Sequence, residues 1–399
     1  MRIPAFIETL AQRVERATRR PLPPAPAPVE NVLEGIRDLF SPDRPESTAV
    51  PKGYGRPIRA RDLPPPGEGL RVVTYNAAQG AKLDAYRSGE NRADQARLLN
   101  EVQAGVIAFQ EVDQQLDRSG DVNTALDVVR RLNPALAPFA EGSVPAQALN
   151  GGLVEAGDRR PALLQGADGT TVHESGGGAL VNANVLDASL RPVRGDNEGS
   201  YGMATYVAPP FELTEAYTYL LPRTAEAGLS SQRERISGLA DGPLSASERA
   251  ELSNANVALR EAKTAQEPRA ALVTRVRDPR NPEAPERSII NVHLSTDAAV
   301  REAQMEVVAE LVRAESSATP PREVVLLGDF NAQPVELEEV MARAGMRRVV
   351  GSPNAPADER GTANIDLVWV SRDAETEASA QLKTEGTTDH VHAGTTTLR

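Results

Sequence analysis

Several short apolar runs in this sequence end at polar or charged residues of the kinds that enzymes use. Such runs, rich in valine, isoleucine and leucine, are typical of strands that are buried on both faces. Burying a charged or amide group is costly, so its repeated appearance at strand ends indicates that these groups meet in one polar site. The polar residues at or near these ends are Asn76, Glu111, His293, Asp329, Asn331, Asp366, Asp389 and His390.

The chemistry of this set favours a divalent cation and a phosphate group. Its carboxylates are hard oxygen ligands, which Mg²⁺ and Mn²⁺ prefer, and its asparagine amides can bind a metal or a phosphate oxygen. Its imidazoles can donate hydrogen bonds or move protons near neutral pH. The chain has no cysteine, no Gly-x-Ser-x-Gly motif and no Gly-x-x-x-x-Gly-Lys-Ser/Thr motif, which argues against thiolate zinc sites, serine hydrolases and P-loop enzymes. We therefore expect Mg²⁺, with Mn²⁺ as a substitute.

The segments that carry these residues resemble, in the same order, those of the endonuclease/exonuclease/phosphatase family. They are Thr-Tyr-Asn at 74–76, Gln-Glu-Val-Asp at 110–113, Asn-Val-His-Leu at 291–294, Gly-Asp-Phe-Asn at 328–331, Ile-Asp-Leu-Val at 365–368 and Thr-Asp-His at 388–390. Each segment alone is a weak signal, whereas the full set in order is specific. The resemblance implies a DNase I-like four-layer α/β sandwich, in which two packed, mostly antiparallel or mixed β-sheets are flanked by helices. It also implies a metal-dependent hydrolase of phosphate esters.

The resemblance assigns metal and water chemistry to five of the matched residues. Glu111 is the expected main metal ligand, with Asn76 and Asp389 as further ligands. Asp329 is expected to orient or deprotonate the attacking water. Asn331 is expected to contact the phosphate and to help position Asp329.

The remaining candidates act on the phosphate side of the reaction. His390 is expected to hydrogen-bond the scissile phosphate while Asp366 holds its ring in orientation. His293 is expected to bind phosphate or to assist the leaving group. Tyr201 and Arg269 lie outside the matched segments and are further candidates for substrate binding, because arginine suits a phosphate. A plain salt bridge is the alternative for Arg269.

Buried strands and covering helices are expected to position these groups. Helical spacing of apolar residues predicts helices over Asn91–Gln103 and Val300–Ala314. Sheets covered by helices are the arrangement that such a mixture favours. The runs of strand length are Leu70–Tyr75, Val106–Phe109, Ala270–Val276, Ile289–Leu294, Val324–Leu327 and Ile365–Val370.

Residues 1–66 are interpreted as an N-terminal extension and residues 67–399 as the catalytic domain. In the extension, apolar residues at helical spacing predict short amphipathic helices, and prolines predict a linker. Two insertions are expected in the domain. Residues at about 142–200 are rich in Gly, Asn and Asp and predict long loops that could include a hairpin; those at about 224–268 predict helices with a capping box at Ser245.

The composition of the chain limits its partners. The net charge of −12 does not attract a polyanion by itself, so a nucleic-acid substrate would need a metal ion or a local arginine cluster. No apolar run is long enough to span a membrane, although the N-terminal helix could make a peripheral membrane contact. No signal-peptide pattern is evident, which fits either a cytoplasmic protein or one exported by a route without a cleavable signal, and does not decide between them. We separately expect a monomer.

The expected function is Mg²⁺-dependent hydrolysis of a phosphodiester by in-line attack of water, with nucleic acid as one substrate class. A lipid or inositol phosphate phosphoesterase, similar to a sphingomyelinase, is the alternative, because the N-terminal helices and the second insertion could approach a membrane. A catalytically inactive binding module on the same fold is a second alternative. The intact set of carboxylates and histidines argues against it.

Overall fold

The computed structural model describes residues 57–80, 89–134, 162–165, 170–175, 178–187, 199–224, 236–240, 242–261, 267–351, 365–390 and 392–399. The predicted N-terminal amphipathic helices and the proline-rich stretch between them lie outside these residues. The last part of the predicted extension is described. There Ile58 forms a parallel β-bridge with Leu382, and Ala60 is buried in a short 3-10 helix, Ala60–Asp62.

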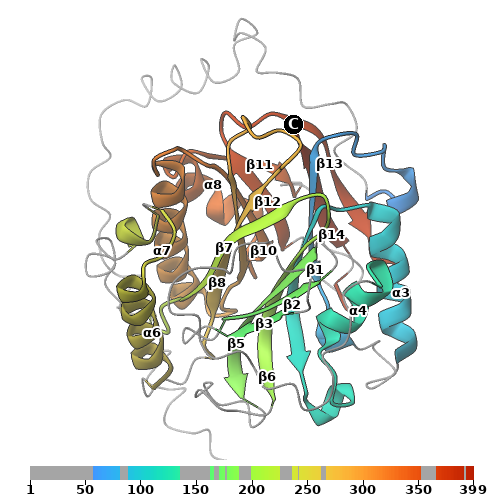
Figure 1. Ribbon diagram of the computed structural model, residues 1–399, viewed down its shortest axis with the longest axis horizontal. Coiled ribbons are helices and arrows are strands. Elements are labelled where there is room, and N and C mark those ends of the chain that lie inside the picture. The colour runs from blue at the N-terminus through green and yellow to red at the C-terminus, as the bar shows by residue number, and fades with distance from the viewer. Residues whose placement is uncertain are drawn as a thin grey trace, which may run out of the picture. The chain divides into compact units, whose positions relative to one another are not determined.

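One mixed sheet has eight strands, in the order β13-β14-β1-β2-β6-β5-β4-β3 (Figure 1). β1 and β2 are parallel, and the other neighbouring pairs are antiparallel. The bounds of its strands are Leu70–Asn76 (β1), Val106–Gln114 (β2), Ala162–Gln165 (β3), Thr170–Ser175 (β4), Gly178–Asp187 (β5), Ser200–Val207 (β6), Thr376–Lys383 (β13) and His392–Leu398 (β14).

The second mixed sheet has six strands, in the order β11-β12-β10-β9-β8-β7. β9 and β10 are parallel, and their neighbours in the sheet are antiparallel. The bounds of its strands are Glu212–Leu220 (β7), Ala270–Arg277 (β8), Arg287–His293 (β9), Glu323–Asp329 (β10), Met346–Val350 (β11) and Asp366–Ser371 (β12).

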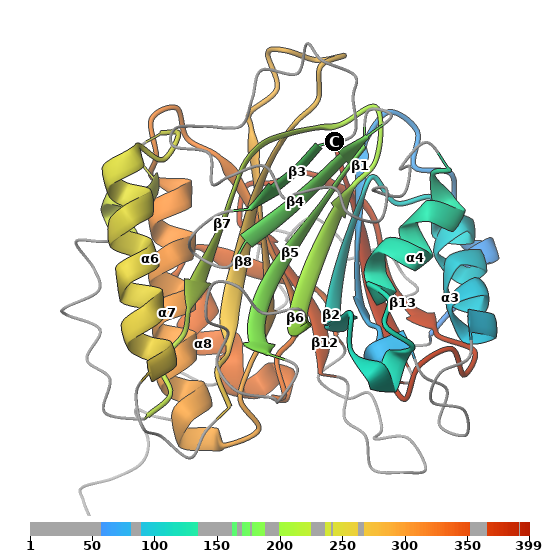
Figure 2. The ribbon, with the colours of Figure 1, turned by 60° about the horizontal axis from the view of Figure 1, so that its bottom comes forward.

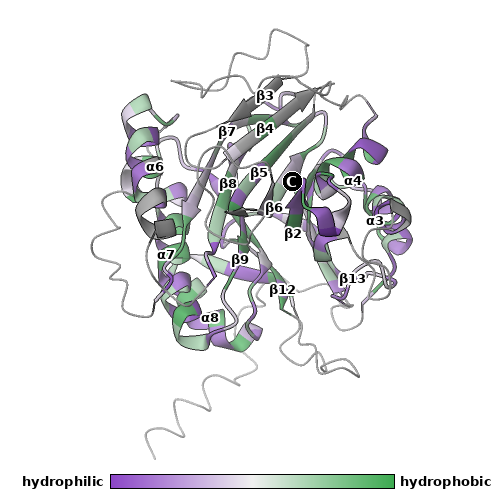
Figure 3. Cartoon of the chain, turned by 90° about the horizontal axis from the view of Figure 1, so that it is seen from below, coloured by the Kyte–Doolittle hydropathy of each residue, from purple (hydrophilic) through white to green (hydrophobic). Residues whose placement is uncertain are grey.

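Helices cover the outer face of each sheet (Figure 2). Figure 3 shows hydrophobic residues on strands between the two groups of helices, and both hydrophobic and hydrophilic residues on the helices. Among the described residues, no helix is long and apolar enough to cross a membrane. The helices are Gly89–Val102 (α3) and Thr124–Leu132 (α4) on one side, and Ala246–Glu261 (α6), Ala298–Ser316 (α7) and Pro334–Arg343 (α8) on the other.

Side chains along the central strands point alternately to the two faces of the sheet, and both faces are covered by apolar layers, which explains why these strands are apolar throughout. In β1, Val72 belongs to the core between the two sheets, together with Val325 of β10. Val73 and Tyr75 belong to the core beneath α3 and α4, together with Leu99. Because successive side chains of a strand point to opposite faces, a strand between two apolar layers needs apolar residues at every position. The ends of these strands are therefore held by packing on both faces.

The predicted fold class is confirmed, because two packed mixed sheets are flanked by helices. The six predicted strand runs all fall on strands, and the two predicted helices correspond to α3 and α7. In the described part of residues 142–200, β4 and β5 form an antiparallel hairpin, and β3 adds a further strand. The helix α6 occupies residues 246–261, and the capping box forms: Ser245 N donates to Glu248 Oε2, and Glu248 N donates to Ser245 Oγ.

Candidate active site

Three of the predicted site residues form a row across neighbouring strands of the six-stranded sheet. Asp329, the last residue of β10, is the register partner of His293 at the end of β9 and of Asp366 at the start of β12. Because β9 and β10 are parallel and β12 is antiparallel to them, the ends of two strands and the start of the third meet at one edge. All three side chains are buried.

The eight-stranded sheet contributes Asn76 and Glu111 from β1 and β2, its parallel pair. Asn76 ends β1 and is the register partner of Gln110 on β2. Glu111 follows at a β-bulge, where the register between β2 and β6 shifts between Phe109 and Val112. Its φ is 55°, a left-handed conformation that costs a non-glycine residue about 1–2 kcal/mol. Bulges redirect side chains, and this one turns Glu111 toward the other sheet.

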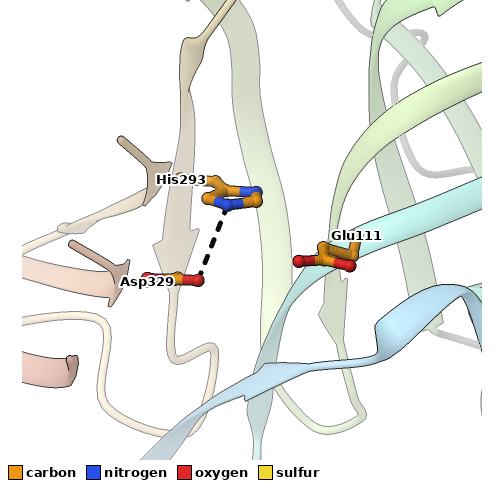
Figure 4. A group of neighbouring side chains, drawn as sticks. All are labelled: Glu111, His293 and Asp329. Atoms are coloured by element: carbon orange, nitrogen blue, oxygen red, sulfur yellow. Dashed lines mark ion pairs between the residues drawn. The ribbon is translucent and has the colours of Figure 1, made fainter. Parts of the chain in front are cut away.

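Glu111, His293 and Asp329 form a compact group across the space between the two sheets (Figure 4). Each residue offers one metal-ligand atom, and these atoms all lie within 4.8 Å of one another. Nε2 of His293 lies 3.5 Å from Oδ2 of Asp329. Oxygen and imidazole ligands this close together can share one divalent cation.

The Asn76 amide connects the two halves of this group. Its Nδ2 lies 3.1 Å from Glu111 Oε1, 3.2 Å from Asp329 Oδ2 and 3.0 Å from His390 Nε2. Its Oδ1 accepts a hydrogen bond from the backbone N–H of Ala78 at 3.0 Å. The amide group is therefore oriented with its NH₂ toward the site.

His390 is held by Asp366, as the sequence led us to expect of the pair. Nδ1 of His390 lies 2.6 Å from Asp366 Oδ2, which is a short, charge-assisted contact. Nε2 of the same ring faces the site, 3.6 Å from Asp329 Oδ2. Asp389 is exposed and accepts a hydrogen bond from Thr388 Oγ1 at 3.2 Å.

The turn after β10 fixes Asp329. Asn331, with φ 48°, donates its backbone N–H to Asp329 Oδ1 at 2.9 Å. Its Nδ2 donates to the carbonyl of Leu294 at 2.9 Å. Gly328 has φ 146°, and a Cβ there would lie 2.0 Å from Val292 O. Only glycine allows β9 and β10 to approach this closely at the site.

Burial governs the pKa values of the two carboxylates in the group. Desolvation, followed by the negative charge of Asp366, raises the pKa of Asp329 to about 7. Desolvation also raises the pKa of Glu111, with a further contribution from the charge of Asp389, while the hydrogen bond from Asn76 opposes the shift. A nearby cation would favour the ionised form of both groups.

The two histidines are shifted in opposite directions. Burial, and then the positive charges of Arg269 and His390, hold the pKa of His293 well below its usual value. Burial acts against protonation of His390 as well, but Asp366, with Asp329 and Asp389, outweighs it and raises the pKa of His390 to about 10. At neutral pH His293 is therefore neutral and able to act as a ligand, whereas His390 is cationic.

Comparison with known proteins agrees with this arrangement. A sequence profile described as "Endonuclease/Exonuclease/phosphatase family" matches residues 73–390, which is most of the chain. This chain belongs to the endonuclease/exonuclease/phosphatase family. A comparison with curated protein sequences found no significant match.

Three solved structures are similar to this chain at low sequence identity. The human Nocturnin catalytic domain with bound sulfate is 14% identical, over 83% of this chain and 93% of that one, with a TM-score of 0.46. A mannosyl-6-phosphatase from Bacteroides thetaiotaomicron is 12% identical, over 83% and 99%, with a TM-score of 0.49. An endonuclease/exonuclease/phosphatase from Beutenbergia cavernae DSM 12333 is 16% identical, over 83% and 71%, with a TM-score of 0.47.

The donor chemistry of the site fits the divalent cation that is typical of this family. Glu111 is half-buried and Asp329 is buried, and desolvation is the main cause of the raised pKa of both carboxyls, so a cation between them would favour their ionised forms. Of the predicted ligands, Glu111 belongs to the compact group and Asp389 does not. Asn76 contacts Glu111 and Asp329 through Nδ2, which is a donor and not a metal-ligand atom, while its Oδ1 accepts from a backbone N–H. The metal roles of Asn76 and Asp389 stay predictions. His293, predicted to act on the phosphate, lies among the residues that can bind the metal.

The two additional candidates for substrate binding both interact electrostatically with Glu111. The charge of Arg269 lowers the pKa of Glu111, and the Arg269 guanidinium forms a salt bridge of 2.8 Å with Glu267, so the salt-bridge interpretation also has support. Tyr201, at the start of β6, is buried, and the nearby Glu111 charge raises its pKa further after the effect of burial. Both side chains are within electrostatic reach of the expected metal ligand.

Two more residues of this family member belong to the site but carried no motif in the sequence. Gln79 donates from Nε2 to Glu111 Oε2 at 3.0 Å, from a position with φ 58°. Arg118 makes a two-point contact with the buried carboxylate of Asp113, at 2.9 and 2.7 Å. Its guanidinium lies 5.1 Å from the ring centre of Tyr201. The spacing of Asp113 and Arg118 in the sequence could have suggested their salt bridge. It could not have suggested that the Arg118 guanidinium lies over the Tyr201 ring.

Proposed function

We propose that this chain hydrolyses a phosphodiester with Mg²⁺ as its cation, Mn²⁺ being able to substitute. The observation that carries the proposal is the convergence of Glu111, His293 and Asp329 within 4.8 Å, beside a His390 ring that Asp366 holds at 2.6 Å. These residues come from two sheets and several strands, so their convergence is a property of the fold and not of one motif. Family membership supports phosphate-ester chemistry.

A diester is preferred over a monoester because of the charge of the site. Glu111, Asp329, Asp366 and Asp389 place several carboxylates around the reacting group, and the chain carries a net charge of −12. A diester brings one negative charge near neutral pH, whereas a monoester brings up to two, and like charges repel strongly in a buried site. Arg118 and Arg269, on the Glu111 side, offset part of this repulsion for either substrate.

Each residue has a role that follows from its environment. Glu111, Asp329 and His293 would hold the ion, which when bound supplies positive charge to the phosphate oxygens. A bound cation would keep Asp329 ionised at neutral pH, so its carboxylate can orient water and accept a proton from it. His390, with a pKa near 10, can donate a charged hydrogen bond to the phosphate.

Removal of either charged partner is expected to stop turnover without unfolding the protein. Asp329→Ala and His390→Ala should each lower kcat on bis(p-nitrophenyl) phosphate with Mg²⁺ by at least about 100-fold. His392→Ala, two residues further along, serves as a matched control and should stay within about twofold. EDTA should abolish the activity of the unchanged protein. Near-normal kcat in either purified, folded variant would reject the assigned roles.

The natural substrate class is a separate question, which a panel can answer. Plasmid DNA, RNA, sphingomyelin vesicles and inositol phosphates would each be incubated with the protein and Mg²⁺ or Mn²⁺. We expect cleavage of nucleic acid, because Arg118 and Arg269 lie on the Glu111 side of the site. Turnover confined to sphingomyelin or inositol phosphates would favour the lipid or inositol phosphate alternative. No metal-dependent turnover of any substrate would favour a binding module.

A further inference from the structure

The bulge that directs Glu111 is supported from the opposite sheet by a buried asparagine. Asn291, on β9, is 0% exposed, and its Nδ2 donates to the carbonyls of Phe109 and Ala204, each at 3.0 Å. Phe109 and Ala204 are the last register pair of β2 and β6 before the bulge. A bulge interrupts the hydrogen-bond ladder of its strand pair. A single amide from the other sheet therefore binds both strands at the point of interruption.

Gln110 joins the same amide to β1. Its Nε2 donates to Asn291 Oδ1 at 2.7 Å, and its Oε1 accepts from Thr74 Oγ1 at 3.2 Å. All three side chains are buried, and the surrounding core between the sheets is apolar. A buried network whose members find partners fixes one arrangement, because any other would leave polar groups unpaired.

The position of this network relates it to the site. Gln110 precedes Glu111 directly, and Asn291 lies two residues before His293 on the same strand. The network thus links the two sheets directly beside Glu111, His293 and Asp329, which come from both sheets. Packing of apolar side chains alone would permit small sliding of one sheet on the other, whereas hydrogen bonds of 2.7–3.0 Å specify distance and direction.

We propose that Asn291 is a positioning residue that holds the β2 bulge, and so sets Glu111 at the distance from His293 and Asp329 that a shared cation needs. The inference rests on the proposed metal-dependent function and extends it to a residue that touches neither metal nor substrate. Without the Asn291 donors, the left-handed conformation of Glu111 loses its support. β2 then relaxes toward a regular strand, and a change of one position in the strand turns a side chain to the opposite face.

The test compares Mg²⁺ binding with the effect on folding. Isothermal titration calorimetry with Mg²⁺ would be performed on the unchanged protein, Asn291→Leu, Glu111→Gln and Ser288→Ala. Ser288 is the matched control: it lies at the other end of β9, is 0% exposed, and donates to Glu315 Oε2 at 2.5 Å. Asn291→Leu and Glu111→Gln should each weaken Mg²⁺ binding at least tenfold. Ser288→Ala should lower Tm yet leave the Mg²⁺ affinity within twofold.

A structural measurement makes the inference independent of metal binding. Asn291→Ser keeps one donor and is the second variant if Asn291→Leu does not fold. Crystal structures of the unchanged protein and of the variant should show that φ of Glu111 becomes negative when Asn291 is replaced. An unaltered bulge, or unaltered Mg²⁺ affinity in a folded Asn291 variant, would overturn the inference. Absence of Mg²⁺ binding by the unchanged protein would instead reject the proposed function. The φ of Glu111 in the two crystal structures would still show whether Asn291 holds the bulge.

Discussion

At the scale of single residues, the site keeps two histidines in opposite protonation states at neutral pH. Burial opposes protonation of both rings, so the difference comes from their neighbours. His293 faces Arg269 and the cationic His390, which lower its pKa further. His390 faces three carboxylates, and Asp366 provides both charge and a hydrogen bond. One imidazole is thus suited to bind a cation and the other to bind an anion.

Asp366→Asn should remove the largest contribution that raises the His390 pKa, so that burial, which lowers it, is opposed only by the charges of Asp329 and Asp389. The folded pKa of His390 lies above its unfolded value, so the pair stabilises the fold fully below about pH 6.5 and loses this contribution as pH rises through about 10. We expect NMR titration in EDTA to show His390 protonated at pH 8 in the unchanged protein and neutral in the variant. The alkaline limit of activity should move to lower pH. Identical titration of His390 in both proteins would contradict this account.

At the scale of elements, the row His293–Asp329–Asp366 depends on how closely β9 and β10 approach. Gly328 allows this approach, since a Cβ would lie 2.0 Å from Val292 O. Gly345 serves as a control, because it has a φ of 77° and open space around its Cβ position. Replacing it therefore tests backbone strain without a steric clash. Gly345→Ala should cost about 1–2 kcal/mol for strain alone, and Gly328→Ala at least about 3 kcal/mol because overpacking is added. Urea unfolding in EDTA measures both values, and equal losses would show that the close approach is unimportant.

The strand ends of the site could be predicted from the sequence because buried strands require apolar residues throughout, so each polar terminus stands out. The bulge at Glu111 could not be predicted in this way. Its left-handed φ of 55° is held by Asn291, which is 180 residues away in the chain (291 minus 111). The strand β3, beside the β4–β5 hairpin, could not be predicted either, since strand formation depends on neighbouring strands more than on intrinsic preference.

At the scale of the whole molecule, the candidate metal group joins the two sheets, so a cation would link binding to global stability. Glu111, which is half-buried, and Asp329, which is buried, have raised pKa values, and they come from different sheets. In the absence of a cation their ionisation opposes the packing of one sheet on the other. Bound Mg²⁺ would attract both carboxylates and so offset this repulsion. It would stabilise the folded state alone, because the unfolded chain does not bring the two residues together.

Stability in EDTA should therefore fall between pH 6.5 and 8.5, and added Mg²⁺ should restore it. In this window the folded state binds more protons than the unfolded state, because burial and neighbouring charges raise the pKa of Asp329 to about 7 and that of His390 to about 10, both above their unfolded values. His293 opposes this only near pH 6.5, where it is neutral in the folded state and partly protonated in the unfolded state, and its contribution is smaller than the other two together. Mg²⁺ at 100 times its Kd should add about 2.7 kcal/mol, with a larger rise in Tm at pH 8.5 than at pH 6.5. Glu111→Gln should lose most of this rise. A Mg²⁺ effect that is equal at both pH values, or that persists in Glu111→Gln, would place the cation elsewhere.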